Sequence, residues 1–232
     1  MIPISDENVT RRIPFCTWGL IAANIAVFVY QVSMPAEELE KFVYMWGLVP
    51  ERLYPALTSH SLPALEAAFL PMLTHMFIHG SLLHLLGNIW ALWVFGDNIE
   101  DRLGHGLFVL FYFVTGWTGA VLHSILNLDS LLPTVGASGA IAGVMGGYFL
   151  LFPFAWITVL IPIFIFPLFV KLPAAVYLLV WVLIQFLGGY ASMAKPGMSG
   201  GIAFLAHLGG FAAGMLLVVL WAGKRQAARR GR

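Results

Sequence analysis

One serine of this chain lies among glycines in a strongly apolar stretch. The segment TVGASGAIAGVMGG, residues 134–147, places Ser138 between Ala137 and Gly139, and five of its fourteen residues are glycine. A serine at a helix start can be a simple N-cap or a small packing residue. It can also be a nucleophile when a base lies within hydrogen-bond reach. Which interpretation applies depends on whether a base and hydrogen-bond donors lie at the same depth of the fold as Ser138.

Two other apolar segments carry side chains that could work with a nucleophile. The first is HMFIHGSLLHLLGNIW, residues 75–90, and the second contains His207. His207 is a candidate base. His84 and Asn88 are four residues apart, so they share one helix face and can donate hydrogen bonds to a developing negative charge. The backbone N–H of Ser138, free at a helix start, is a third candidate donor.

Two histidines of the same segment are expected to play a structural part. His79 precedes His84 by five residues, which on one continuous helix places it roughly 140° away and off the His84–Asn88 face. We interpret His75 and His79 as satisfied histidines that tie the segment to the preceding loop. A zinc peptidase is disfavoured, because there is no HExxH pattern and no acidic residue near these histidines.

The composition requires that most of the surface faces lipid. The chain has 232 residues, of which 60% are hydrophobic and only 10% charged, and its mean hydropathy is +0.87. Soluble domains have roughly 25% charged residues. The net charge of +1 and the absence of a basic stripe argue against nucleic acid as a partner. Cys16 is the single cysteine, so no intramolecular disulfide forms.

The apolar runs predict an all-α polytopic membrane protein with six spans. They are residues 14–32, 69–95, 107–127, 138–153, 172–189 and 202–221. Residues 1–13 are expected to be a cytoplasmic N-terminal segment, 14–222 a six-helix membrane domain with a long outer loop between the first two helices, and 223–232 a basic cytoplasmic tail. Arginines and lysines flank the two ends and acidic residues dominate the first loop, which places both termini in the cytoplasm.

The apolar stretch 154–170 is the exception to this pattern. Four prolines stand in or beside it, at positions 153, 162, 167 and 173. That density argues against a regular membrane helix. We therefore expect a re-entrant or interfacial connection on the cytoplasmic side, which keeps the number of spans even.

Six spans bring the polar groups to one depth. The second, fourth and sixth spans all enter from outside, and Ser138, His207 and the His84–Asn88 pair lie in their outer parts. Small-xxx-small faces let membrane helices approach closely. They are predicted for the fourth span by Gly139, Gly143 and Gly147 and for the sixth by Gly210 and Gly214. Packing these faces together brings Ser138 within reach of His207.

Four motifs in order make the chain similar to the rhomboid family of intramembrane serine proteases. Gly136-Ala137-Ser138-Gly139 resembles the GxSG nucleophile motif, and Ala206-His207 with Gly210 and Gly214 resembles AHxxGxxxG. The remaining two are HxxxxHxxxN at His79, His84 and Asn88, and GxxxExxxG at Gly96, Glu100 and Gly104. The resemblance covers roughly residues 12–222.

The resemblance implies an endopeptidase that cuts transmembrane proteins near the outer membrane boundary. Ser138 is then the nucleophile and His207 the general base, without an acid, a metal or a cofactor. His84, Asn88 and the Ser138 amide form the oxyanion hole, with His79, Gly136, Gly139, Gly210 and Gly214 in support. Asp129, the acid nearest before Ser138, is expected to be a solvated loop residue.

Two departures from the family pattern concern the surroundings of the site. Leu70-Pro71 stands where many members have Trp-Arg, and Ala142 stands where some have a tyrosine that packs on the catalytic histidine. Support for the His207 ring must then come from elsewhere or be looser.

The alternative class is a non-enzymatic polytopic protein, either a transporter or a pseudoprotease that binds membrane helices. The expected partners of the protease are transmembrane substrates and the lipid bilayer. Nothing resembles an organelle transit peptide, which favours a prokaryotic plasma membrane.

Overall fold

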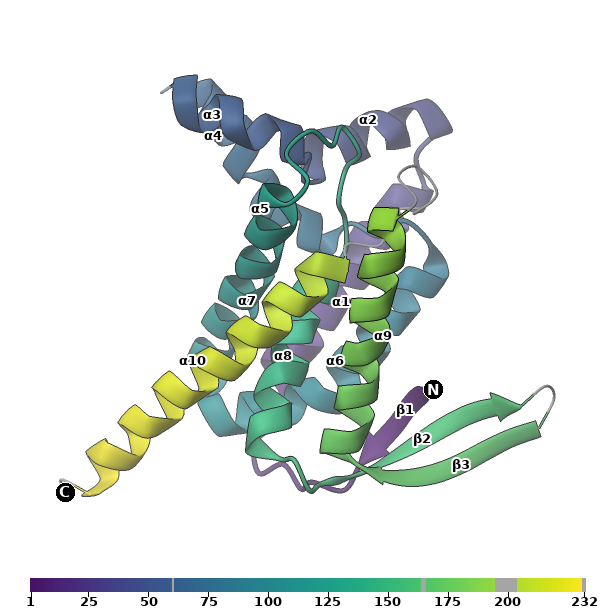
Figure 1. Ribbon diagram of the computed structural model, residues 1–232, viewed down its shortest axis with the longest axis vertical. Coiled ribbons are helices and arrows are strands. Elements are labelled where there is room, and N and C mark those ends of the chain that lie inside the picture. Colours follow the sequence, from purple (N-terminus) through teal and green to yellow (C-terminus); the bar gives the residue numbers. More distant parts are fainter. Residues whose placement is uncertain (60, 164–165, 195–203, 231–232) are drawn as a thin grey trace.

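The computed structural model describes residues 1–59, 61–163, 166–194 and 204–230. Six long helices form a bundle, short helices cover one end, and a β-hairpin projects at the other end (Figure 1). The bundle helices are α1 (Phe15–Val32), α6 (Leu82–Leu103), α7 (His105–Ile125), α8 (Ser138–Leu151), α9 (Ala174–Ala194) and α10 (Phe204–Arg230). They correspond to the six predicted spans, although residues 202 and 203 of the sixth lie outside the described residues. The prediction of a helical polytopic membrane bundle is confirmed.

The helices differ in how well their lengths match a membrane. Among the described residues, α1, α7 and residues 204–221 of α10 are long and apolar enough to cross, and residues 62–103 pass the same test only as a bent pair. Helix α8 has 14 residues, fewer than the roughly 20 that a bilayer needs. Since α8 begins at Ser138, its N-terminus lies inside the bundle, and residues before it enter from the outer end without helical structure.

The predicted bounds of the second span, residues 69–95, are wrong at both ends, because the helix begins at Leu82 and ends at Leu103. Residues 62–77 form α4 (Leu62–Phe69), α5 (Pro71–Thr74) and the 3-10 turn η2 (His75–Phe77), and they make an angle of 79° with α6. The break follows from Gly80-Ser81, where the Ser81 hydroxyl accepts the His84 N–H at 3.1 Å and caps α6. The helix then continues to Leu103, so the GxxxExxxG motif lies within its last turns rather than after it.

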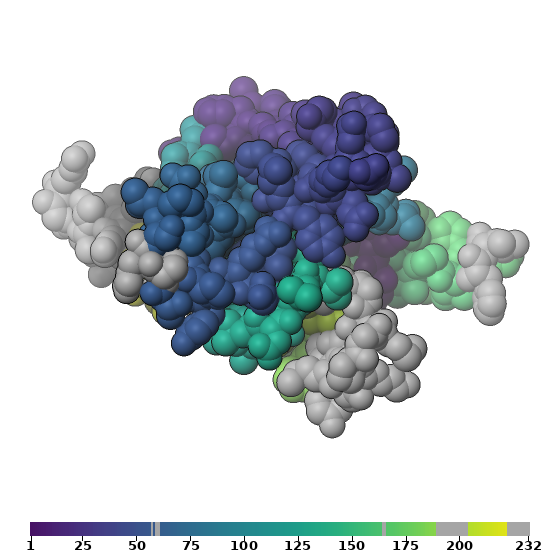
Figure 2. Space-filling view, turned by 90° about the horizontal axis from the view of Figure 1, so that it is seen from above, coloured from purple at the N-terminus to yellow at the C-terminus, as the bar shows by residue number. Residues whose placement is uncertain are grey.

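The outer end is covered by the first loop. This loop contains α2 (Ala36–Trp46), the 3-10 turn η1 (Pro50–Arg52), α3 (Leu53–Ser59) and α4. Seen from above, these purple and blue segments spread over most of that face, with the teal loop before α8 beside them (Figure 2).

The proline-rich stretch is a β-hairpin, which adds a small sheet to the predicted all-α fold. Strands β2 (Trp156–Ile163) and β3 (Phe166–Pro173) pair antiparallel, and the N-terminal strand β1 (Ile2–Asp6) pairs with β2. Pro162 and Pro167 face each other next to the turn, and Pro173 ends β3, where a missing N–H disturbs the ladder least. The stretch therefore does not cross the membrane.

The sheet also fixes the parity of the spans. Because β1 precedes α1 and the hairpin follows α8, the four helices between them must return the chain to the side on which it began. Strand β1 is tied to the bundle by Asp6, which accepts hydrogen bonds from Tyr148 Oη at 2.6 Å and Asn98 Nδ2 at 2.9 Å. Burial raises the pKa of the Asp6 carboxyl above its usual value.

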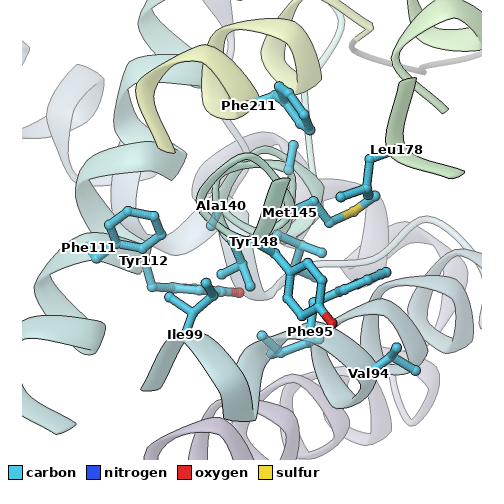
Figure 3. Close-up of a cluster of buried hydrophobic side chains, with 14 of the residues drawn as sticks. Val94, Phe95, Ile99, Phe111, Tyr112, Ala140, Met145, Tyr148, Leu178 and Phe211 are labelled. Atoms are coloured by element: carbon cyan, nitrogen blue, oxygen red, sulfur yellow. The ribbon is translucent and has the colours of Figure 1, made fainter. Parts of the chain in front are cut away.

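Helix α8 runs through the centre of the core. The close-up in Figure 3 shows it surrounded by side chains of its neighbours, with Phe95 of α6 beside Tyr148 and Phe211 of α10 on another side. Phe95 and Tyr148 meet edge to face with ring centroids 5.0 Å apart, and both are fully buried. Every residue from Gly139 to Tyr148 is buried, so the helix that begins at Ser138 is held on all sides.

Glu100 links three helices at the end opposite the outer loop. Its carboxylate accepts the N–H groups of Cys16 and Thr17 at 3.0 and 2.7 Å, and the Thr17 hydroxyl at 2.6 Å. His105 Nδ1 lies 2.6 Å from the same carboxylate. Glu100 thereby satisfies the free N–H groups at the start of α1, where a negative charge is favoured by the helix dipole.

Candidate active site

The glycines of α8 and α10 bring the two backbones into contact. A Cβ atom on Gly210 would collide with the carbonyl oxygen of Gly139, and one on Gly214 would collide with that of Gly143. Gly146 is likewise closed against the backbone of Phe211. The glycine faces predicted from the sequence thus pack directly against each other. Any side chain at these positions would push the two helices apart.

This close packing places Ser138 next to His207. Ser138 is the first residue of α8, and His207 lies one turn before Gly210 on α10. The Ser138 Oγ atom is 2.7 Å from His207 Nε2, a hydrogen-bond distance. A hydroxyl and an imidazole in this arrangement can act as nucleophile and base.

The chain reaches Ser138 through the segment before α8, residues 133–137, which is held by the outer loop. Leu48 and Thr134 exchange both backbone hydrogen bonds, at 3.0 and 2.7 Å. The Gly136 N–H then donates to the His75 carbonyl at 2.9 Å. Gly136 has a φ of 122°, a conformation that side chains disfavour. The outer loop therefore sets where the helix with the nucleophile begins.

His84 and Asn88 lie beside the segment before α8, on the predicted common face of α6. A Cβ atom on Gly136 would come within 2.7 Å of the His84 ring and 3.6 Å of Asn88 Nδ2. Both side chains line the same cavity as Ser138. Helix α8 has no side-chain cap at its N-terminus. The unused N–H groups there and the two α6 side chains are donors that converge beside Ser138.

The prediction that His79 points away from the His84–Asn88 face is wrong. His79 precedes the start of α6, so helical spacing does not apply to it. Its Nε2 atom lies 2.9 Å from Asn88 Nδ2, and its ring meets that of His84 edge to face at 5.1 Å. One N–H of the Asn88 amide is thus held by His79, which orients the other.

The structural role expected for His75 and His79 is also seen. Gln31 of α1 pairs with the backbone of His79, accepting its N–H at 3.0 Å and donating to its carbonyl at 3.2 Å. His75 Nδ1 lies 2.8 Å from the Pro71 carbonyl. The Gln31 bonds tie the loop before α6 to the first helix, and the His75 bond is local to the segment before α6.

The support that Ala142 cannot give to His207 comes from α9, which sequence reasoning overlooked. His207 Nδ1 lies 2.7 Å from Gln185 Oε1. The Trp181 ring of α9 lies 5.9 Å from the imidazole at an interplanar angle of 34°, and Phe204 of α10 meets it edge on at 6.4 Å. Asp129 is an exposed loop residue, as expected. The signal was present, because a glutamine within an apolar span is unusual and suggests a function.

These residues surround a cavity of about 810 Å³. Its lining comes from helices α6, α8, α9 and α10 and from the segment before α8. Apolar side chains form most of it, and the polar groups are those of Ser138, His207, Gln185, His84, Asn88 and Ser81. An apolar cavity with a few converging polar groups is the usual form of a ligand site.

The potential metal ligands of the described residues cluster elsewhere. Cys16, Glu100 and His105 have ligand atoms within 4.8 Å of one another. They lie at the end of the bundle away from Ser138, where the Glu100 carboxylate already accepts hydrogen bonds from α1. Their arrangement is explained by the capping of α1.

Comparison with known proteins identifies the family. Residues 66–224 match the Rhomboid domain model. RHOMBOID-like protein 1 of Arabidopsis thaliana is 25% identical over 228 residues, covering 88% of this chain and 54% of that protein. Rhomboid protease GluP of Bacillus subtilis (strain 168) is 39% identical over 75 residues, covering 32% of this chain and 14% of the protease.

A mitochondrial relative extends this range. Rhomboid protein 1, mitochondrial, of Saccharomyces cerevisiae is 32% identical over 146 residues, covering 60% of this chain and 38% of that protein. The chain spans about half or less of the length of these three relatives. The glycine-packed helices, the Ser138–His207 contact and the match over residues 66–224 agree, and the chain belongs to the rhomboid family.

Proposed function

We propose that this protein is an intramembrane serine endopeptidase that hydrolyses peptide bonds in or near transmembrane segments of other proteins. The observation that carries the proposal is the 2.7 Å contact between Ser138 Oγ and His207 Nε2 within an apolar cavity. A half-buried hydroxyl–imidazole pair with nearby hydrogen-bond donors is what acyl transfer requires. The protease name of the Bacillus subtilis relative agrees with it.

The first half of the reaction forms an acyl-enzyme. Ser138 Oγ attacks the carbonyl carbon of the substrate, and its proton passes to His207 Nε2. The carbonyl oxygen becomes negatively charged in the tetrahedral intermediate. His207 then gives its proton to the leaving amide nitrogen, and the peptide C–N bond breaks.

The oxyanion is stabilised by donors that are fixed before the substrate arrives. His84, the Asn88 amide and the Ser138 N–H are assigned this role. His79 holds one N–H of Asn88, so the other keeps a defined direction. Donors of this kind contribute about 10²- to 10³-fold each to kcat.

The second half of the reaction releases the product. A water molecule, deprotonated by His207, attacks the ester carbon, and Ser138 recovers its proton as the carboxylic acid leaves. The water must reach Ser138, which lies below the outer end of the bundle. The segment before α8 and the polar loop before α6 meet there.

The proposed substrates are membrane spans that unwind near their outer end. The carbonyl carbons of a regular helix are covered by its own side chains and hydrogen bonds, so the scissile segment must be extended. Glycine, proline or polar residues in the substrate favour this. The relatives are bacterial, plant and mitochondrial, and the prokaryotic plasma membrane stays a prediction from the sequence.

The test is cleavage of a model transmembrane substrate in liposomes by the whole chain. Ser138→Ala and His207→Ala should each abolish cleavage, and the double variant should be no worse, because the pair acts as a unit. Ser5→Ala, an exposed serine on β1, is the matched control and should cleave normally.

A serine-directed fluorophosphonate separates the protease from a pseudoprotease or a transporter. It should label the native chain and not Ser138→Ala. Substantial turnover by purified, folded Ser138→Ala, or an unlabelled native chain, would contradict the proposal.

A further inference from the structure

His207 uses both of its ring nitrogens. Nε2 contacts Ser138 Oγ and Nδ1 contacts Gln185 Oε1, each at 2.7 Å. A neutral imidazole carries one proton on one of these nitrogens. If Nδ1 carries it and donates to the Gln185 carbonyl oxygen, Nε2 is left with a free lone pair directed at the Ser138 hydroxyl. This is the tautomer that a general base needs.

Gln185 is one of three residues of α9 that share a face toward His207. Trp181 lies one turn before it, with its ring over the imidazole. Gly188 follows three residues later, and a Cβ atom there would come within 2.6 Å of the Phe204 ring. Phe204 in turn meets His207 edge on. The imidazole therefore contacts two aromatic rings, with an amide at one nitrogen and a hydroxyl at the other.

Burial makes the Gln185 contact strong and specific. Gln185 is 8% exposed although the adjacent residues Ile184 and Phe186 are 54% and 59% exposed. An amide in apolar surroundings is costly unless it is hydrogen-bonded, so its bond to His207 is favoured over an unpaired alternative. The described residues place no carboxylate in the lining of the cavity.

We propose that Gln185 is the positioning residue of the site: its carbonyl oxygen accepts the Nδ1 proton of His207 and so takes the orienting role that an acid has in serine triads. This rests on the proposed function of the Ser138–His207 pair. During acylation the Ser138 proton moves to Nε2, and the Nδ1 proton stays on the imidazolium, since an amide oxygen is too weak a base to remove it. The proton on Nε2 then goes to the leaving nitrogen.

A neutral amide suits this location better than an acid would. A carboxylate would stabilise the imidazolium more, but it would remain as an unpaired buried charge whenever His207 is neutral. Gln185 orients the ring without that cost. The other titratable groups that act on His207 are His84 of α6 and His123 of α7, and they are unchanged in the variants below.

The first variant removes the bond and keeps the volume. Gln185→Leu should lower kcat about fivefold with KM nearly constant, because one neutral hydrogen bond is worth about 1 kcal/mol. Phe186→Leu, the next residue on the lipid side, is the control and should behave like the native chain. Labelling of Ser138 by the fluorophosphonate should slow in Gln185→Leu by the same factor as kcat.

The second variant distinguishes orientation of the ring from anchoring of the helix. Gln185→Glu provides only acceptor oxygens when ionised. It should restore most of the kcat lost in Gln185→Leu, and the acid limb of the pH–kcat profile should move to higher pH, because a carboxylate favours the imidazolium. Helix anchoring alone predicts no such movement.

Three results would overturn the assignment while leaving the proposed function intact. One is native kcat in Gln185→Leu. Another is Gln185→Glu with the native pH profile. The third is loss of kcat in Gln185→Leu that follows a matching loss of folded protein in thermal unfolding. If the native chain itself neither cleaves substrate nor labels at Ser138, the proposed function fails instead.

Discussion

Two of the helices that contact α10 around His207 do so in different ways. Helix α8 meets α10 backbone to backbone, through Gly139 and Gly143 against Gly210 and Gly214. Helix α9 meets it through long side chains, chiefly Trp181 and Gln185. The distance between nucleophile and base is thus set by a rigid seam. The orientation of the base is set by side chains, which have rotamer freedom that a glycine seam lacks.

The exposed surfaces of the two helices agree with this difference. Helix α8 is buried from Gly139 to Tyr148. Helix α9 turns a row of large apolar side chains outward, namely Val176, Leu179, Leu183, Ile184, Phe186 and Leu187. Substitutions in the α8–α10 seam should therefore act on folding and activity together. Substitutions of Trp181 or Gln185 in α9 should act mainly on the base, and those on its outward face should change little.

The largest effect is expected in the seam itself. In Gly214→Val, the new Cβ would collide with the Gly143 carbonyl, so the helices must separate at a cost of about 3 kcal/mol, the upper end of the usual range for overpacking. We expect loss of cleavage and a strongly lowered Tm in detergent. Ala212→Val on the exposed side of α10 is the matched control. A Gly214→Val protein with native Tm would show that the seam is not rigid.

The next largest effect is expected in the segment before α8, which leads to Ser138. Gly136→Ala combines a φ of 122° with a methyl group 2.7 Å from the His84 ring. The backbone strain costs about 1–3 kcal/mol. Displacement of His84 from Ser138 should lower kcat about a hundredfold, as the loss of an oxyanion donor does.

The control for this variant is Gly106→Ala at the start of α7, where a methyl group meets nothing within 4 Å. It should cleave at the native rate. Comparable kcat values for the two glycine variants would mean that Gly136 does not position the donors.

The seam was predictable from the sequence and the contacts of α9 were not. Glycines every four residues predict close packing, and they placed Ser138 beside His207 correctly. Gln185 shows no such periodicity. Its role depends on how α9 is rotated about its axis, which is fixed by packing against α10 rather than by local sequence.

The remaining errors arose where local structure changes type. His79 was judged by helical spacing, but Gly80-Ser81 ends that spacing and lets its ring fold back to Asn88. The prolines correctly indicate that the stretch 154–170 is not a regular membrane helix. The pairing of this hairpin with β1 could not be foreseen, because β1 lies about 150 residues earlier in the chain, and long-range strand pairing has little local signal.

A smaller effect is expected from the aromatic contact of α9. Trp181→Leu removes the ring over His207 and keeps an apolar side chain at the helix surface. An aromatic contact of this kind is worth about 0.5–1.5 kcal/mol, so kcat should fall about threefold to tenfold while Tm changes little. Trp93→Leu on the exposed face of α6 is the control. A fall in KM or Tm alone would assign Trp181 to packing and not to the base.

The smallest effect is expected for a substitution on the outward face of α9. It tests whether only one face of that helix is packed against the protein. Leu183 is 54% exposed and Leu178 is fully buried, although both are leucines on the same helix. Leu178→Ala leaves a cavity in the core and should cost about 3 kcal/mol. Leu183→Ala exchanges one apolar contact with lipid or detergent for another, since lipid tails are as apolar as leucine, and should cost about 0.5 kcal/mol or less.

The measurement is thermal unfolding of the two variants in the same detergent, with kcat determined in liposomes. If Leu183→Ala destabilises the protein as much as Leu178→Ala does, α9 is packed on both faces, and the contrast between a rigid seam and a side-chain contact is wrong.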